Sequence, residues 1–215
     1  MNRRDEIAAN LLAVQGKITR PDITLIAVTK TYPVSDVQIL HELGINNFGE
    51  NRNEEGLEKS AQVAGRWHFQ GEIQSRKLRD IARWADVIHS LDDASHATKL
   101  NSVTEKEIDV FLQLSLDGDP ARGGVRASEL AALGAHLHTL PNVNLVGLMC
   151  VLPLGVEARI GFTEVAKIHR DFQGEFPGAQ SLSAGMSGDF EIAIDCGATH
   201  IRVGSQILGM RPPHG

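Results

Sequence analysis

Residues 23–30 read Ile23-Thr24-Leu25-Ile26-Ala27-Val28-Thr29-Lys30, an almost uninterrupted apolar run that closes on a lysine. A short apolar run rich in β-branched residues is typical of a strand buried on both faces, as in a parallel sheet. Such a strand would bring the amine of Lys30 to its carboxyl end. In α/β proteins, binding and catalytic groups gather at the carboxyl ends of parallel strands.

Short apolar segments alternate with longer amphipathic ones along the rest of the chain. Seven further strands are predicted at residues 46–50, 67–72, 87–91, 110–116, 143–151, 180–183 and 200–208. Helical periodicity predicts helices between consecutive strands, at residues 34–43, 51–63, 74–84, 94–106, 128–140, 157–176 and 189–196. Another helix, 5–15, precedes the first strand, and the segment after the last strand is too short for an eighth crossover helix.

Strict alternation of strands and helices implies parallel strands joined by right-handed crossovers, and eight such strands predict a closed (β/α)8 TIM-like barrel with an extra N-terminal helix. An open, doubly wound sheet is the alternative, although no GxGxxG motif follows any predicted strand. No repeat, low-complexity stretch or Pro/Gly/Ser-rich linker divides the chain. We therefore expect residues 1–215 to form one domain.

The composition argues against several classes of protein. A chain of 215 residues with 42% hydrophobic side chains can bury a full core without disulfides. The formal charge is −6 and forms no block of one sign, so neither nucleic acid nor an anionic membrane is an expected partner. Without a signal segment or a run of about 18 apolar residues, the expected location is cytoplasmic. Cys150 and Cys196 are far apart in the sequence, which favours free thiols over a disulfide or a zinc site.

Glycine and serine punctuate the last part of the chain. Residues Gly185-Met186-Ser187-Gly188-Asp189 precede a predicted helix, whose first N–H groups would hold an anion, although an ordinary Ser or Asp cap gives the same pattern. Gly204 and Ser205 would add donors at the end of the last strand. If the sheet closes, that strand lies beside the first one, and the donors approach Lys30. Burial would lower the pKa of this amine and favour its nucleophilic form, whereas a lysine at a strand end is commonly a solvated residue.

Taken in order, these segments resemble the pyridoxal-phosphate homeostasis protein family, small single-domain relatives of the alanine racemase N-terminal barrel. The matching stretches are LIAVTKTYP (25–33), FGEN (48–51), WHFQG (67–71), VIHSLD (87–92), GLM (147–149), GMS (185–187), GAT (197–199), IRVGS (201–205) and LG (208–209). The resemblance spans the chain from the first predicted strand to its end.

The resemblance implies a protein of intracellular pyridoxal 5'-phosphate homeostasis, which holds the cofactor reversibly as a Schiff base on Lys30 and passes it to apoenzymes. The phosphate would be received by Ser187, Gly204 and Ser205. Met186 belongs to the same cofactor-binding set.

The resemblance also places Asn51 near the cofactor ring and Arg202 at the pyridine nitrogen. From the residues alone, Arg202 is equally well one half of an ion pair inside the barrel. A guanidinium only donates hydrogen bonds, so the ring nitrogen opposite it would stay unprotonated. An unprotonated ring is a poor electron sink, which disfavours carbanion chemistry.

Two other activities remain open: a weak amino-acid racemase that uses the same cofactor, and a Schiff-base aldolase. A racemase needs a base on each face of the substrate, and in full-length racemases the second base is a tyrosine from a separate C-terminal domain. The single tyrosine here, Tyr32, is expected to line the mouth or to pack. A carrier without efficient catalysis is therefore favoured, with amino acids and apoenzymes as partners and a monomer as the assembly.

Several positions depart from the usual family pattern. Gln70 replaces a branched apolar residue, Glu72 a proline and Arg76 a common asparagine, changes expected to alter which amino acids or enzymes approach the mouth. His68, flanked by Trp67 and Phe69, is expected to be a hydrogen-bonded core histidine.

Overall fold

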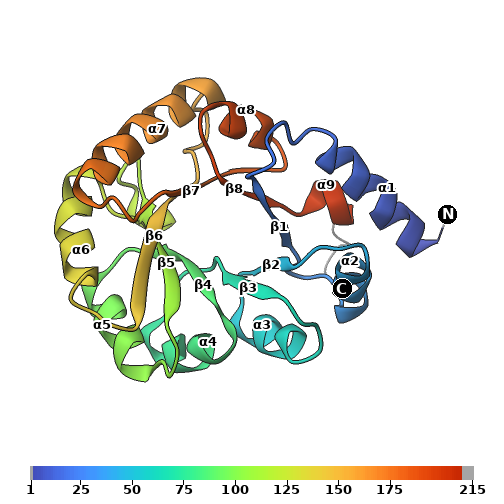
Figure 1. The fold of residues 1–215 in the computed structure, drawn as a ribbon, viewed down its shortest axis with the longest axis horizontal. Coiled ribbons are helices and arrows are strands. Elements are labelled where there is room, and N and C mark those ends of the chain that lie inside the picture. The colour runs from blue at the N-terminus through green and yellow to red at the C-terminus, as the bar shows by residue number, and fades with distance from the viewer. Residues whose placement is uncertain (1, 210–215) are drawn as a thin grey trace.

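Eight parallel strands close into a barrel in the computed structural model, which describes residues 2–209 (Figure 1). The strands are β1 (Thr24–Val28), β2 (Asn47–Glu50), β3 (Arg66–Phe69), β4 (Val87–Leu91), β5 (Ile108–Leu114), β6 (Val143–Cys150), β7 (Ser181–Met186) and β8 (His200–Val203). Closure is made by β8, which pairs with β1 from Thr24 opposite His200 to Ala27 opposite Val203. The predicted barrel is confirmed, and an open sheet is excluded.

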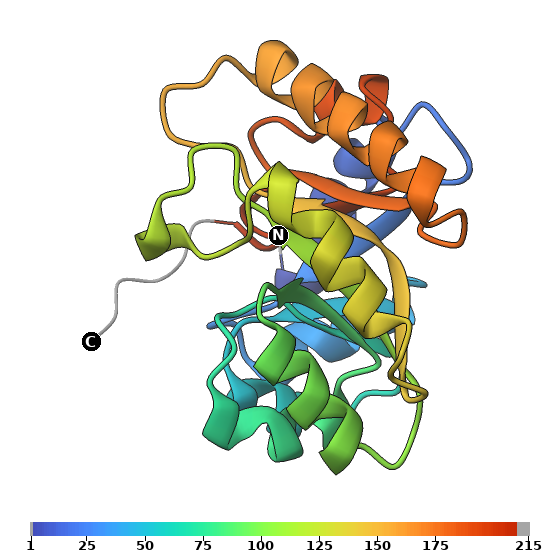
Figure 2. The ribbon, with the colours of Figure 1, turned by 90° about the vertical axis from the view of Figure 1, so that its left-hand side faces the viewer.

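Helices lie around the outside of the strands, as Figures 1 and 2 show. They are α1 (Arg3–Gln15), α2 (Val34–Glu42), α3 (Asn53–Ser60), α4 (Leu78–Trp84), α5 (Ala94–Val103), α6 (Leu130–Leu137), α7 (Ala158–Glu175), α8 (Phe190–Asp195) and α9 (Ser205–Leu208). The predicted N-terminal helix is present as α1. Between residues 2 and 209, none of the helices combines the length and apolarity needed to cross a membrane.

Local sequence signals explain where the helices begin. The carboxylate of Asp93 accepts hydrogen bonds from the N–H groups of Ser95 and His96 and caps α5, and Glu157 caps α7 in the same way. From Phe162 to Phe172 the buried residues of α7 follow a spacing of three or four, which turns one stripe of the helix toward the sheet.

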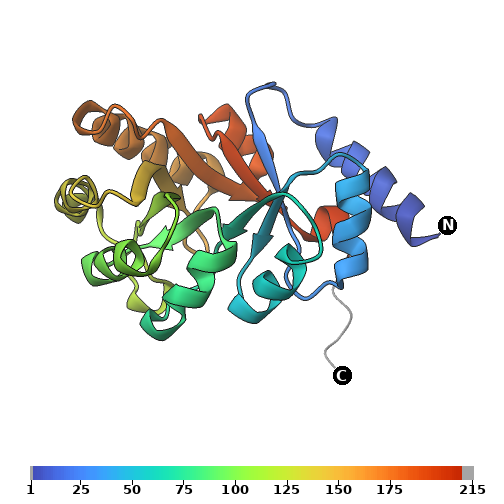
Figure 3. The ribbon, with the colours of Figure 1, turned by 60° about the horizontal axis from the view of Figure 1, so that its bottom comes forward.

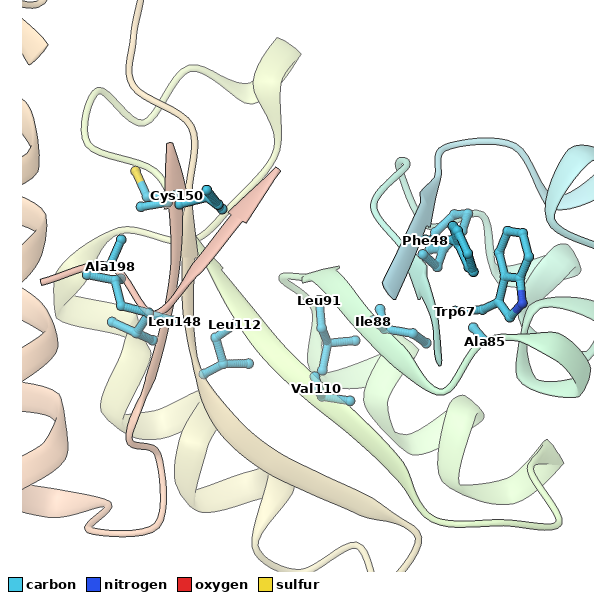
Figure 4. Packing of buried hydrophobic residues seen from close by; sticks show 14 of the residues in the cluster. Phe48, Trp67, Ala85, Ile88, Leu91, Val110, Leu112, Leu148, Cys150 and Ala198 are labelled. Carbon is cyan, nitrogen blue, oxygen red and sulfur yellow. The ribbon is translucent and has the colours of Figure 1, made fainter. Parts of the chain in front are cut away.

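The apolar core lies between the strands and the surrounding helices. Phe48 on β2 and Trp67 on β3 lie together in Figure 4, with ring centroids 5.1 Å apart. Trp84 meets Trp67 edge to face at 6.4 Å, so the aromatic residues attach α4 to the sheet. One face of this helix is buried, with Leu78, Ile81, Ala82 and Trp84 turned to the core.

The structure corrects the predicted end of the last strand. β8 stops at Val203, and the residues predicted to extend it form α9 instead. This short helix packs against α1, because Arg3 donates to the carbonyl oxygen of Leu208 at 2.9 Å and Asn10 to that of Ile207 at 3.1 Å. A single helical turn is too short to show a helical period in the sequence, which explains the error.

The first strand is also shorter than predicted. β1 ends at Val28, and Lys30 lies two residues further on, half-buried in a turn. The next residue, Thr31, has a φ of 71°, which is unfavourable for a β-branched residue. The lysine is thus carried by a tight turn at the barrel mouth and not by the strand itself.

Strands β6 and β7 approach each other closely at Gly147, where a Cβ would lie 1.7 Å from the carbonyl oxygen of Ser181. Gly147→Ala must separate these strands, and we expect it to lower the free energy of unfolding by about 3 kcal/mol in urea denaturation followed by circular dichroism. The matched control is Gly174→Ala in α7, where a Cβ meets nothing within 4 Å and alanine is the better helix former. Equal stability of the two variants would contradict the close approach.

Candidate functional site

The end of β1 and the loops that follow β7 and β8 meet at one edge of the barrel mouth. Figure 3 shows β8, in red, running beside β1, in blue. Gly204 directly follows β8, and a Cβ at this position would lie 3.1 Å from the carbonyl oxygen of Val28. Because Lys30 is two residues beyond Val28, strand closure brings its turn next to the Gly204 loop.

The two loops are joined to each other through Ser187. Its hydroxyl oxygen accepts a hydrogen bond from the N–H of Gly204 at 3.3 Å, and its carbonyl oxygen accepts one from the side-chain amide of Gln206. Ser205 is exposed at the start of α9, and a Cβ on Gly188 would meet nothing within 4 Å. The three residues predicted to receive an anion, Ser187, Gly204 and Ser205, are therefore brought together.

A buried cation holds the chain just before Lys30. The ammonium of Lys59 donates to the carbonyl oxygen of Thr29 at 2.8 Å, to Glu50 at 2.7 Å and to Glu55 at 3.0 Å. The side chains of Lys59 and Glu50 are 4% and 0% exposed. Burial raises the pKa of Glu50, and the nearby Lys59 opposes that rise.

The same cluster also holds the chain after Lys30. Glu55 accepts a hydrogen bond from the N–H of Thr31 at 2.6 Å. The peptide groups on both sides of the lysine are therefore fixed by charged side chains, which stabilises the unfavourable backbone of Thr31. The sequence interpretation missed Lys59; the i,i+4 spacing of Glu55 and Lys59 is a usable signal of their contact, but it does not reveal that the pair is buried.

Arg202 is 5% exposed inside the barrel. Its guanidinium donates to the hydroxyl oxygen of Ser183 at 2.6 Å and to the carbonyl oxygen of Cys150 at 3.0 Å. Both partners are neutral, so these contacts differ from the ion pair considered as an alternative. Burial lowers the pKa of Arg202 to about 10, which still leaves it charged at neutral pH.

A chain of buried polar groups continues from Ser183. The hydroxyl of Ser183 lies 2.9 Å from Nδ1 of His89, whose Nε2 lies 2.9 Å from Nδ1 of His68. Nε2 of His68 lies 3.1 Å from the side-chain oxygen of Asn47. Burial lowers the pKa of both histidines well below the usual value. The expectation that His68 is a hydrogen-bonded core residue is confirmed.

Other predicted site residues lie around the mouth. Asn51 follows β2, on the opposite side of β1 from β8, and lines a cavity of about 130 Å³ together with Phe69 and Glu72. Met186 ends β7 and is 41% exposed. Tyr32 is buried, and its hydroxyl donates to the carbonyl oxygen of Gly209 at 2.6 Å, consistent with the expected packing role.

The other half of the mouth contains a cavity of about 850 Å³. It lies at the carboxyl ends of β3 to β6, and its polar lining includes Asp92, Asp117 and Arg122. Gln70 and Glu72, two of the departures from the family pattern, also line it. These departures therefore affect this half of the mouth more directly than the loops beside Lys30.

Comparison with known sequences gives consistent matches. The family described as alanine racemase, N-terminal domain, matches residues 3–212. A pyridoxal phosphate homeostasis protein from Corynebacterium glutamicum is 38% identical over 217 residues, covering 95% of this chain and 98% of that protein. The protein of the same name from Escherichia coli is 34% identical over 228 residues, with coverage of 96% and 97%.

Solved structures resemble the barrel over nearly its whole length. PipY of Synechococcus elongatus, solved with PLP bound, superposes with a TM-score of 0.87 at 32% identity, covering 94% of this chain and 100% of PipY. Alanine racemase from Corynebacterium glutamicum superposes with a TM-score of 0.79 at 17% identity, covering 98% of this chain and 62% of that enzyme. The racemase comparison shows a shared fold only.

The Lys59 cluster gives a stability prediction. Lys59→Met leaves the buried Glu50 carboxylate without its cation, and we expect a loss of about 3–5 kcal/mol in the free energy of unfolding at pH 7. The double variant Glu50→Gln/Lys59→Met removes both charges and should recover most of this loss. Urea unfolding measures both variants. If Lys59→Met is as stable as the unsubstituted protein, Lys59 and Glu50 do not form a buried ion pair.

The buried histidines predict a loss of stability in mild acid. The pKa values of His68, His89, His169 and His200 are lowered, mainly by burial. Arg66 adds to the effect at His68, His89 and His200, and Arg202 at His89 and His200. As the pH falls, the histidines of the unfolded chain therefore take up protons before those of the folded protein. The free energy of unfolding falls below pH 6.5, by about 1.4 kcal/mol per pH unit for each histidine. The raised pKa of Glu50 increases the free energy of unfolding as the pH falls, but this is the effect of one group against four histidines.

Urea unfolding between pH 7.5 and 5.5 measures this slope. A His200→Gln variant should have a shallower slope, because the pKa of His200 is lowered to about 4. Gln38→Ala, at an exposed position of α2, removes no titratable group and is the control, so it should leave the slope unchanged. A stability that is independent of pH over this interval would contradict the burial of neutral histidines.

Proposed function

Because the chain belongs to the pyridoxal phosphate homeostasis protein family and carries the alanine racemase N-terminal domain, we propose that it binds pyridoxal 5'-phosphate and serves the intracellular homeostasis of this cofactor. It holds the cofactor reversibly through Lys30 and passes it to apoenzymes. The observation that carries this proposal is the meeting of the Lys30 turn with the joined loops of Ser187 and Gly204.

The groups at this edge of the mouth fit a phosphate. The hydroxyls of Ser187 and Ser205 can donate to a phosphate, and so can the N–H of Gly204 when a phosphate oxygen replaces the Ser187 hydroxyl as its acceptor. Gly204 has no side chain to fill the space beside Val28, and Gly188 leaves open space above its loop. In this proposal Ser187, Gly204 and Ser205 receive the phosphate.

Lys30 supplies the amine. When bound, the cofactor offers an aldehyde, which reacts reversibly with a primary amine. The cluster of Lys59, Glu50 and Glu55 fixes the peptide groups on either side of Lys30, so the amine approaches from a defined backbone position. A fixed backbone lowers the entropy cost of bringing the two groups together.

Arg202 meets the cofactor ring at its nitrogen in this proposal, with Asn51 and Met186 beside the ring. A guanidinium with a pKa of about 10 remains a donor at neutral pH and has no hydrogen-bond acceptor to offer. The ring nitrogen then stays unprotonated, which weakens the electron withdrawal that racemisation requires. We therefore favour a carrier over a racemase.

The proposal includes partners beyond the cofactor. The cavity of about 850 Å³ offers the carboxylates of Asp92 and Asp117 and the guanidinium of Arg122, groups that complement the ammonium and carboxylate of a free amino acid. Amino acids and apoenzymes are the partners we expect, with the protein acting as a single-domain monomer in the cytoplasm.

Covalent trapping tests the proposal. The purified protein is incubated with pyridoxal 5'-phosphate, reduced with borohydride, digested and mapped by mass spectrometry. We expect a pyridoxyl adduct on Lys30 alone and its loss in Lys30→Ala. Lys77→Ala, a lysine paired with Glu54 at the surface, is the matched control and should keep the adduct. An adduct on another lysine, or none at all, would overturn the assignment of Lys30.

A further inference from the structure

A continuous chain of hydrogen-bonding groups crosses the interior of the barrel. It runs from Arg202 on β8 through Ser183 on β7 to His89 on β4, His68 on β3 and Asn47 on β2. In the closed strand order, β7 and β8 stand across the barrel from β3 and β4. These hydrogen bonds therefore connect Arg202, near the end of β8 at the barrel mouth, with Asn47 at the beginning of β2.

The groups at the two ends set the direction of this chain. The side-chain oxygen of Asn47 only accepts, so Nε2 of His68 must carry the hydrogen. In a neutral ring Nδ1 of His68 is then an acceptor, and it receives the hydrogen on Nε2 of His89. Nδ1 of His89 in turn accepts from the hydroxyl of Ser183, whose oxygen accepts from Arg202. In each of the four hydrogen bonds, the donor is therefore the group nearer to the guanidinium along the chain of hydrogen bonds.

The opposite direction fails at Asn47, because it would require the side-chain oxygen of Asn47 to donate. At the other end, His89 and Arg202 would both donate to the oxygen of Ser183, and the hydroxyl hydrogen of Ser183 would then need another acceptor. Protonating His89 would place a second positive charge in the same water-excluded interior as Arg202. His89 is 0% exposed, and its ring stacks on Phe111 with centroids 4.4 Å apart, so solvent does not compensate such a charge.

From this geometry we propose that Ser183 and His89 are positioning residues that hold the Arg202 guanidinium in the orientation in which it meets the ring nitrogen of the bound cofactor. The inference rests on the proposed function. The hydroxyl hydrogen of Ser183 is committed to His89, so the serine oxygen can only accept from Arg202. Together with the carbonyl oxygen of Cys150, it anchors both terminal nitrogens of the guanidinium.

The consequence is that the electronic state of the cofactor depends on side chains that do not touch it. Among residues 2–209, the structure assigns acceptors to two of the five N–H groups of Arg202. Because these two hydrogen bonds fix the plane of the guanidinium, they also fix the directions of its other three N–H groups. If Ser183 loses its hydroxyl, the guanidinium keeps one anchor and can rotate about it.

Nuclear magnetic resonance on cofactor-free protein tests the direction of the chain without any substitution. Nitrogen-15 spectra of labelled histidines, assigned through bonds, should show both His68 and His89 as neutral rings with the hydrogen on Nε2 at pH 7. In Ser183→Ala, the Nδ1 resonance of His89 should move downfield, as expected for a ring nitrogen that loses a hydrogen bond. A hydrogen on Nδ1 of His89 in the unsubstituted protein would overturn the chain.

The spectrum of the loaded protein tests the positioning role. Ser183→Ala should shift the visible absorption maximum of the bound cofactor in the same direction as Arg202→Gln, while borohydride labelling of Lys30 stays at the unsubstituted level. The matched control is Ser181→Ala, the same change two residues earlier on β7, which should leave the maximum unchanged. Identical maxima for Ser183→Ala and Ser181→Ala would overturn the positioning role.

These outcomes separate the inference from the proposed function. If borohydride labels no lysine in the unsubstituted protein, the proposed function fails, although the histidine spectra can still agree with the chain. If Lys30 is labelled but Ser183→Ala leaves the absorption maximum unchanged, the proposed function stands and the positioning role fails. If Ser183→Ala does not fold, the histidine tautomers of the unsubstituted protein still decide whether the chain runs as inferred.

Discussion

The pairing of β8 with β1 is the constraint on which the rest of the structure depends. These strands come from opposite ends of the chain, and their four paired positions turn a sheet into a ring. Without that pairing the turn that carries Lys30 and the loop that begins at Gly204 would be attached to separate edges. With it, Gly204 lies directly against Val28, so the turn that carries Lys30, two residues further on, lies beside the Gly204 loop.

The buried charges near this edge of the barrel mouth fix the local backbone and side-chain geometry more than they contribute to the free energy of unfolding. Moving an ion pair into the interior costs desolvation energy that its mutual attraction only partly offsets, so Lys59 and Glu50 are a weak source of stability. Their contacts are specific, however, because they fix the carbonyl of Thr29, while Glu55 fixes the N–H of Thr31. Arg202 behaves in the same way: its charge is buried inside the barrel, and its neutral partners Ser183 and Cys150 fix its orientation.

Sequence reasoning recovered the architecture because a repeating pattern specifies it. The alternation of apolar runs and amphipathic segments predicted eight parallel strands, and the family motifs indicated Lys30, Ser187, Gly204 and Ser205 as a group. The errors lie where a single turn decides the outcome. The helix at 205–208 is too short to have a detectable period, and the turn at Lys30 depends on tertiary contacts with Glu55 and Lys59. The buried chain through His89 and Ser183 was invisible, because inward-facing residues of different strands meet only after the barrel has closed.

The contacts of α1 extend the site well beyond the residues at the mouth. Arg3 reaches the carbonyl of Leu208 and also pairs with the buried carboxylate of Asp36 at 2.6 Å, so the first helix braces α9 against α2. Since α9 begins at Ser205, the loop that we propose to receive the phosphate is supported by α1, a helix outside the repeating strand–helix pattern. If this loop binds the phosphate as proposed, a fusion or cleavage at the beginning of the chain would disturb a support of the binding site although it lies outside the barrel mouth.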